Sequence, residues 1–174
     1  IAGKRKAFYR TLYWDTADAQ MYIIHHDRKL NRQKIRVREY VESNLTFLEI
    51  KNKSNKGRTK KIRISVPDEN IKSHEDAVDF INKSAKYGID EISGRLRNQF
   101  SRITLVNKGK TERLTIDISI KFENCVTGNK NTIPALCIVE VKRDGNVYSP
   151  FTSYMADFRI KKKSILTFGK IFVT

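Results

Sequence analysis

Residues 34–38 read Lys-Ile-Arg-Val-Arg, and this short alternation decides the expected fold. Successive side chains of a β-strand point to opposite faces. Arg36 and Arg38 therefore share one face, while Ile35 and Val37 share the other. The same two-faced pattern recurs in residues 46–53, 59–66, 112–121 and 136–142. Segments that are rich in β-branched residues and separated by Gly, Asn and Asp turns predict antiparallel strands.

Strands clearly outnumber helices along the chain. We expect strands over residues 8–14, 34–41, 46–53, 59–66, 100–106, 112–121, 136–142 and 165–173. We expect helices over residues 18–26, 73–87 and 149–158, with Ser73 as one N-cap and Ser149-Pro150 opening the last. This order predicts an α+β class that is mainly antiparallel β. About eight strands can close into a barrel that holds a small ligand, so we expect a tunnel-like barrel with helices packed outside.

The charge balance of the chain limits its partners. The 174 residues carry a formal net charge of +16, which costs self-repulsion unless the excess serves a polyanion. Nucleic acid, an anionic membrane surface and polyphosphate are all admissible. Two cysteines without a CxxC pair favour a reducing compartment, so we expect a cytoplasmic location or the cytoplasmic face of a membrane. No apolar run approaches the roughly 20 residues that span a bilayer.

The polar faces of the predicted strands are strongly one-signed. A solvated face normally mixes signs, because like charges opposite each other destabilise a sheet. We therefore interpret these faces as an inward basic lining that binds phosphates, since Arg grips phosphate oxygens in pairs. The basic residues on these faces are Arg36, Arg38, Lys51, Lys53, Lys61, Arg63, Arg102, Arg113 and Lys142, and the acids are Glu49, Asp117 and Glu140.

The role of the acids stays open on spacing alone. A carboxylate among cations can be an internal counter-ion, or it can hold Mg²⁺ or Mn²⁺, hard ions that bridge to substrate phosphates. The adjacent His25 and His26 lie on a predicted helix, so their side chains diverge and do not make a metal site. Tyr9, Tyr13 and Trp14 on the first strand are interpreted as core or barrel wall.

Several motifs, taken together, resemble a known family. They are Leu12-Tyr13-Trp14-Asp15-Thr16, residues 26–32 (His-Asp-Arg-Lys-Leu-Asn-Arg), Arg36-Val37-Arg38, Glu49-Ile50-Lys51-Asn52-Lys53, residues 57–59 (Gly-Arg-Thr), Leu114-Thr115-Ile116-Asp117 and Glu140-Val141-Lys142. In this order they resemble the polyphosphate polymerase domain of the vacuolar transporter chaperone (VTC) family. That family is part of the triphosphate tunnel metalloenzymes.

The resemblance implies an eight-stranded tunnel and metal-dependent transfer of phosphate from ATP to polyphosphate. Arg36, Arg38, Lys51, Arg102 and Arg113 would act on the transferred phosphates. Lys53, Lys61, Arg63, Lys142 and Lys170 would bind the chain, although residues 167–170 depart from the family's usual Ser-Lys-aromatic form. Glu140 would hold Mn²⁺ or Mg²⁺, with Glu49 and Asp117 as further candidates.

The chain also departs from the family at its start. The family normally opens with a strand that carries a basic or Glu-x-Lys motif, and residues 1–4 look like the interior of a longer chain. We therefore expect residues 1–174 to form a single domain that lacks its first strand. Two alternative functions stay open. One is a tunnel phosphohydrolase that uses water as acceptor, and the other is a non-catalytic module that binds polyphosphate or nucleic acid.

Overall fold

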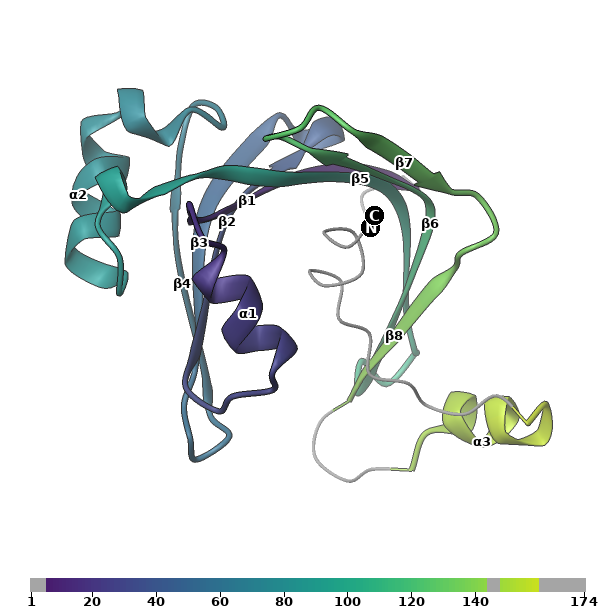
Figure 1. Cartoon of the computed structure of the whole chain (residues 1–174). Helices are drawn as coiled ribbons and strands as arrows, with labels where there is room; N and C mark the ends of the chain where they lie inside the picture. Colours follow the sequence, from purple (N-terminus) through teal and green to yellow (C-terminus); the bar gives the residue numbers. More distant parts are fainter. Residues whose placement is uncertain (1–5, 144–147, 160–174) are drawn as a thin grey trace.

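The computed structural model describes residues 6–143 and 148–159. It is a single curved antiparallel sheet, which forms an arch in Figure 1. The strands are β1 (Ala7–Thr16), β2 (Arg32–Tyr40), β3 (Leu45–Lys53), β4 (Thr59–Ser65), β5 (Ile92–Val106), β6 (Glu112–Asn124), β7 (Lys130–Ile133) and β8 (Ile138–Arg143). The helices are α1 (Gln20–His26), α2 (Glu75–Ser84) and α3 (Pro150–Asp157), with short 3-10 helices at Val41–Ser43, Ile71–Ser73 and Ile89–Glu91.

The strand order places β4 and β8 on opposite arms of the arch. The order is β4-β3-β2-β1-β5-β6-β7, and β8 pairs with the other half of β6. β4 therefore ends one arm and β8 the other, and within the described residues these two strands do not pair. The predicted mainly antiparallel class and strand number are confirmed, but the described sheet is an open arch and does not close into a barrel. The predicted strand over residues 165–173 lies outside the described residues.

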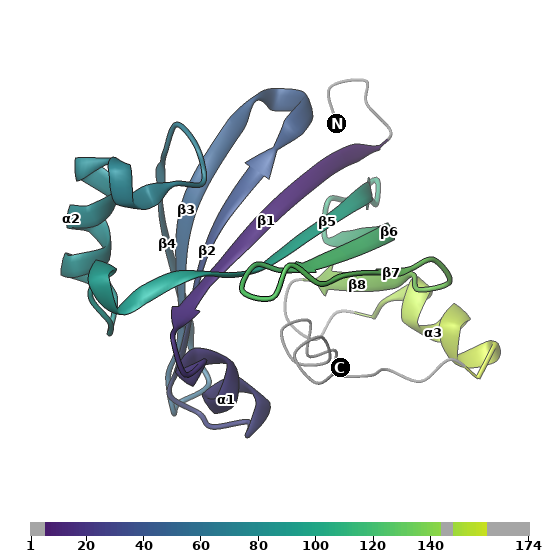
Figure 2. The same cartoon turned by 45° about the horizontal axis from the view of Figure 1, so that its top comes forward.

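The convex side of the sheet carries the main hydrophobic core. Ile35, Val37, Leu48 and Ile50 are buried beneath α2, where they pack in one cluster with Ala77 and Ile81. These are the residues that the alternation of the sequence predicted on the apolar face of β2 and β3. The predicted orientation is therefore confirmed, because the residues between them, such as Arg36, must point to the concave side. Figure 2 shows α2 standing outside the sheet.

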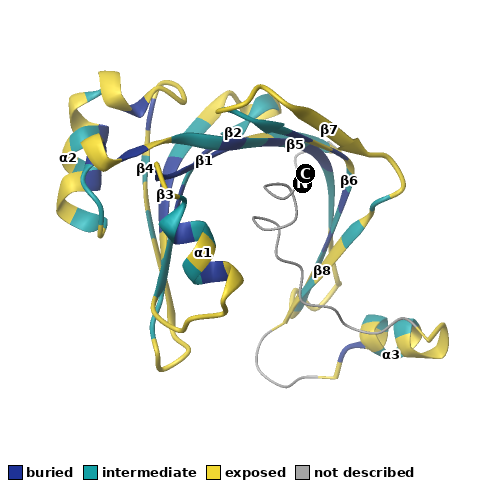
Figure 3. Cartoon of the chain, viewed as in Figure 1, coloured by how far each residue is buried: buried dark blue, intermediate teal, exposed yellow. Residues whose placement is uncertain are grey.

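The helices do not all cover the sheet as predicted. α2 begins at Glu75 with His74 as its N-cap, not Ser73, because the Ser73 hydroxyl donates to the Asn70 carbonyl at 2.8 Å instead. Ser149 does cap α3, and its Oγ accepts the Thr152 amide at 3.2 Å. However, α3 itself has no buried residue, so the expectation that it covers the apolar face is wrong for the part described. Figure 3 shows it in the colours of intermediate and exposed residues.

A bulge in β6 reverses the predicted alternation. Ser119 adopts a positive φ of 55°, and the register between β5 and β6 shifts between Gln99 and Ser101. Because Ser119 is the extra residue, Ile120 does not share a face with Ile116 and Ile118, as the simple alternation predicted. It packs with Phe100 and Phe122 in a separate cluster on the concave side.

Two strand assignments also differ from the sequence prediction. β5 starts at Ile92, eight positions before the predicted residue 100, and β7 was not predicted at all. The polar stretch that includes Arg97 and Gln99 does not read as a strand, yet both residues pair with β1 on one side and with β6 on the other. All four residues of β7 are exposed, so no apolar face marked them as a strand.

Packing of α2 on the convex face is testable by cavity formation. Ile81 is fully buried in this core. Ile81→Ala is expected to lower the free energy of unfolding by about 3 kcal/mol, because it removes buried methyl groups and leaves a cavity. The measurement is urea unfolding at equilibrium. As a control, Ile23→Ala removes the same groups from an exposed side chain and should cost less than about 1 kcal/mol. Equal losses would contradict this core.

Candidate functional site

Basic residues form continuous rows across the concave side of one arm. In the register of β2, β3 and β4, Lys34 lies opposite Lys51, and Lys51 lies opposite Lys61. Arg32 and Lys53 pair in the adjoining row at the strand ends. Like charges placed directly opposite each other destabilise a sheet, so these rows need compensation by an anion. We call the side that carries them the concave face.

The next row contains the most buried ion pair of the described chain. Tyr13, Arg36, Glu49 and Arg63 lie side by side on β1 to β4. Only 1% of the Glu49 side chain is exposed, and its Oε2 accepts from Arg36 Nε at 2.7 Å and Nη2 at 2.6 Å. Its other oxygen contacts Lys61 Nζ. Burial alone would raise the pKa of Glu49, but Arg36 and Lys61 outweigh burial and lower it. Glu49 is therefore a counter-ion held between two cations.

The other arm repeats this arrangement with a second carboxylate. Arg102 and Asp117 face each other on β5 and β6, and Arg102 donates from Nε at 2.5 Å and from Nη2 at 2.7 Å to the two Asp117 oxygens. This bidentate pair occupies both oxygens of the carboxylate. Asp117, like Glu49, is thus already engaged with a cation. Both residues were predicted as candidate metal ligands. In this structure both are paired with cations, and their role toward a metal stays a prediction.

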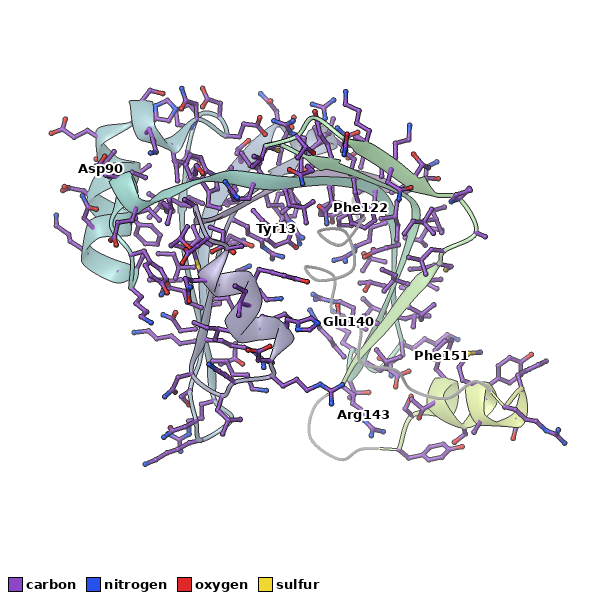
Figure 4. The ribbon with its side chains drawn as sticks, viewed as in Figure 1. Tyr13, Asp90, Phe122, Glu140, Arg143 and Phe151 are labelled. Atoms are coloured by element: carbon purple, nitrogen blue, oxygen red, sulfur yellow. The ribbon has the colours of Figure 1, made fainter. Side chains whose placement is uncertain are left out.

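Glu140 differs from these two carboxylates. Its side chain is 51% exposed, and the described residues give it one ion pair, to Lys142 Nζ at 3.7 Å. It lies opposite Thr115 on β6, on the concave face, and Figure 4 shows it on the inner side of β8. Among the described residues no group of three or more His, Cys, Asp and Glu side chains could hold a metal ion. Glu140 is therefore the most accessible of the predicted carboxylate ligands.

Side chains from the two arms of the arch affect each other electrostatically. The pKa of Lys51 is lowered by burial, then by Arg36 and by Lys142 from the opposite arm, while Glu140 raises it. Lys51 and Lys142 are thus close enough to repel each other, although β3 and β8 lie on opposite arms of the arch. Figure 4 labels Tyr13 and Glu140 on the inner side of the arch, on different strands. The arch brings basic side chains from β2, β3 and β8 around one site.

Arg38 sits deeper, on aromatic rings. Its side chain is buried, its Nε donates to Thr11 Oγ1 at 3.1 Å, and its guanidinium lies 5.7 Å from the ring centres of Tyr9 and Phe100. Burial and then Arg36 lower the pKa of Arg38. Arg102 lies over the same two rings at 5.3 and 5.2 Å. The sequence did not predict this aromatic floor, because Tyr9 and Phe100 lie far apart in the chain.

The remaining predicted residues lie on the same side at greater exposure. Arg113 pairs in register with Lys142 near the end of the second arm. Arg63 stacks its guanidinium 4.3 Å from the centre of the Phe47 ring, and Lys53 lies at the end of β3. Lys170 lies outside the described residues. The structure thus gathers the described candidates on one face, and their roles as phosphate ligands stay predictions.

Two residues of this face were missed by the sequence interpretation. Lys34, the first residue of the predicted strand 34–41, was not among the predicted phosphate ligands. Burial and then Lys51, Arg36 and Arg32 lower its pKa to about 8, with Tyr13 acting in the opposite direction. Tyr13 was assigned to the core or wall. It is buried beside Arg36, and although burial raises its pKa, Arg36, Arg38 and Lys34 together bring the pKa below its usual value. Strict alternation along β1 would have placed Tyr13 on the face opposite to Leu12 and Trp14, and the register of β1 and β2 then sets it beside Arg36.

The described chain combines an arched antiparallel sheet with a concave face that is lined by Arg and Lys. The VTC domain family matches residues 2–165, so the chain belongs to the VTC domain family, and the predicted family is confirmed. No curated protein matches the sequence.

Solved structures share the fold at low sequence identity. A crystal structure of a candidate adenylate cyclase from Bacillus halodurans is similar with a TM-score of 0.54 and 12% identity, covering 95% of this chain and 81% of that one. A candidate adenylyl cyclase from Hippeastrum, described as having a dominant triphosphatase activity, is similar with a TM-score of 0.46 and 16% identity, covering 89% and 73%. At such identities the likeness of the first extends to the fold alone.

The counter-ion role of Glu49 is testable by stability. Glu49→Gln is expected to lower the free energy of unfolding by about 3 kcal/mol, because it leaves the partly buried Arg36 without its counter-ion. Glu140→Gln is the matched control, since that carboxylate is half exposed and its loss should change stability by less than about 0.5 kcal/mol. Urea unfolding near pH 7 measures both. A neutral effect of Glu49→Gln would contradict the counter-ion role.

Proposed function

We propose that this domain transfers the γ-phosphoryl group of ATP to a polyphosphate chain bound on the concave face. The observation that carries the proposal is the row Lys34, Lys51 and Lys61, together with Lys142 across the arch. The carboxylates Glu49 and Asp117 already form ion pairs with Arg36 and Arg102. The face therefore keeps an excess of positive charge that a chain of phosphates matches. Membership of the VTC domain family supports the same conclusion.

The chain's own residues would act by binding and orientation. Lys51 and Lys142 approach the phosphates from opposite arms, so a triphosphate and an acceptor can be aligned end to end between them. Transfer forms a bond from a terminal polyphosphate oxygen to the γ-phosphorus and breaks the bond from that phosphorus to the β–γ bridging oxygen, which leaves with ADP. Arg36 and Arg102 would stabilise the charge on the transferred group. No covalent enzyme intermediate is needed.

A divalent cation fits one part of this face. Mg²⁺ and Mn²⁺ are commonly bound through one or two carboxylates plus substrate phosphates, and Glu140 is a carboxylate that its surroundings leave accessible. Glu140 would hold the ion, which would neutralise charge on the phosphate oxygens when bound. Glu49 and Asp117 fit this role less well, because cations already occupy their oxygens.

The proposal extends to partners and place in the cell. The substrates would be ATP and polyphosphate or another triphosphate, and the acceptor decides between polymer synthesis and hydrolysis. No helix of the described chain is long and apolar enough to cross a membrane. We keep a cytoplasmic location, or the cytoplasmic face of a membrane, as part of the proposal, because ATP is supplied there.

Specific anion binding is the first test. Tripolyphosphate should raise the melting temperature more than sulfate at equal ionic strength, because a ligand that binds only the folded state stabilises it. Lys51→Ala should weaken tripolyphosphate binding by roughly 2 kcal/mol, as expected for charge-assisted hydrogen bonds. Lys56→Ala, in the exposed turn after β3, is the matched control and should bind like the unaltered protein. Identical responses to both anions would leave only general charge screening.

Turnover is the second test. With ATP and Mn²⁺, the domain should produce polyphosphate, visible on a gel, and Glu140→Gln should abolish this product while tripolyphosphate binding is kept or tightened by the lost negative charge. Glu39→Gln, which removes a carboxylate on the convex side, should keep the activity. Free phosphate without polymer would make the domain a hydrolase. Full Mn²⁺-dependent activity of Glu140→Gln would place the metal elsewhere.

A further inference from the structure

A buried histidine lies on the helix that closes one end of the concave face. Asp15, at the end of β1, fixes the start of α1, because its carboxylate accepts the Met21 and Tyr22 amides at 2.9 Å each. The ring of Tyr22 then packs with Tyr13 on the concave face. Met21 and His25 are the buried residues of this helix, and Figure 3 shows the two dark positions on α1. The helix therefore holds His25 in a fixed place.

The His25 ring has an unused polar atom in this position. Its side chain is 9% exposed, and within the described residues Nδ1 is buried without a hydrogen-bond partner. A buried polar atom without a hydrogen-bond partner destabilises the folded protein. A ligand that forms a hydrogen bond with Nδ1 would remove this cost. Its neighbour His26 is different, because its ring is exposed and contacts Tyr22 and Asp27.

The surroundings of His25 are the basic rows of the concave face. The charges that act on its ring come from Lys34 and Arg32 on β2 and from Lys51 and Lys53 on β3. On β1, Asp15 lies near the start of α1, and its carboxylate is already bound there by backbone amides. The side chains of all four cations lie on the same face of the sheet as Arg36. His25 therefore lies on the side of the proposed phosphate site.

Burial, followed by these four cations, lowers the pKa of His25 to about 4. The ring is therefore neutral at pH 7 while the face is free of anion. A phosphate chain bound beside the ring would add negative charge, which favours the charged form of the imidazole. The imidazolium form then becomes favourable, and both ring nitrogens become donors.

We propose that His25 is a ligand of the phosphate chain and binds it as the imidazolium, so that anion binding on the concave face takes up one proton. This inference rests on the proposed function only in that the ligand is a phosphate chain. The proton comes from solvent and returns to it when the chain leaves.

The sign of the pH dependence follows from linkage. A group whose pKa rises on binding makes binding tighter as the pH falls. If binding restores the His25 pKa from about 4 to the ordinary value near 6.5, affinity should increase about tenfold between pH 7.5 and pH 5.5. Tripolyphosphate also binds protons itself, so the contribution of His25 is the part that disappears when this side chain is replaced.

The experiment measures proton uptake and affinity separately. The sequence has only three histidines, so NMR can follow the imidazole signals of the whole protein during a pH titration with and without tripolyphosphate. The His25 signal should titrate at a higher pH in the complex. Calorimetric titration at pH 5.5 and 7.5 should show about a tenfold smaller pH effect for His25→Gln, while His26→Gln should behave like the unaltered protein.

Each outcome separates this inference from the proposed function. Tripolyphosphate binding at pH 7.5 with an unmoved His25 signal overturns the inference and leaves the proposed function intact. An unchanged pH effect in His25→Gln does the same. Failure to bind tripolyphosphate at either pH overturns both. If His25→Gln does not fold, the NMR titration of the unaltered protein decides alone.

Discussion

Repulsion between the cations of the concave face is the constraint on which this structure depends. Lys34, Lys51 and Lys61 stand in one row, and Arg36 lies in the next. A fold can tolerate such a row only if carboxylates offset part of it and if the other face of the same strands supplies stability. Glu49 and Asp117 supply the first, and the core under α2 supplies the second. These carboxylates offset only part of the positive charge of the face, because its basic residues outnumber its acids. A phosphate chain would neutralise the remaining charge.

This balance explains why the acids of the face have different roles. A carboxylate held between two cations, as Glu49 is, has both oxygens occupied, so it cannot move to a metal without leaving the partly buried Arg36 without its counter-ion. Glu140 lies near the end of an arm and half in solvent, where a change of partner costs little. Position in the arch, and not residue type, separates the counter-ion from the available ligand.

The curvature of the sheet matters as much as its charge. Because the arch turns, Lys51 and Lys142 act on each other although β3 and β8 lie on opposite arms of the sheet. The bulge at Ser119 contributes to the turn, since it adds a residue to one strand and bends it. It also moves Ile120 to the concave side, where it packs with Phe100 beside the aromatic floor under Arg38 and Arg102. A flat sheet with the same sequence pattern would present its cations to solvent and surround no ligand.

The sequence by itself determined which side chains share a face, because alternation along a strand is a local geometric rule. Lys-Ile-Arg-Val-Arg at residues 34–38 was enough to place Arg36 and Arg38 opposite the core, and the family motifs supplied the chemistry expected there. It did not reveal β7 or the first half of β5, because those polar stretches become strands only through their neighbours. Only the tertiary structure decided that Glu49 is a counter-ion and that His25 lies against the basic rows. Those outcomes depend on cross-strand register and on how a helix packs at the end of the sheet, which involve residues far apart in the chain.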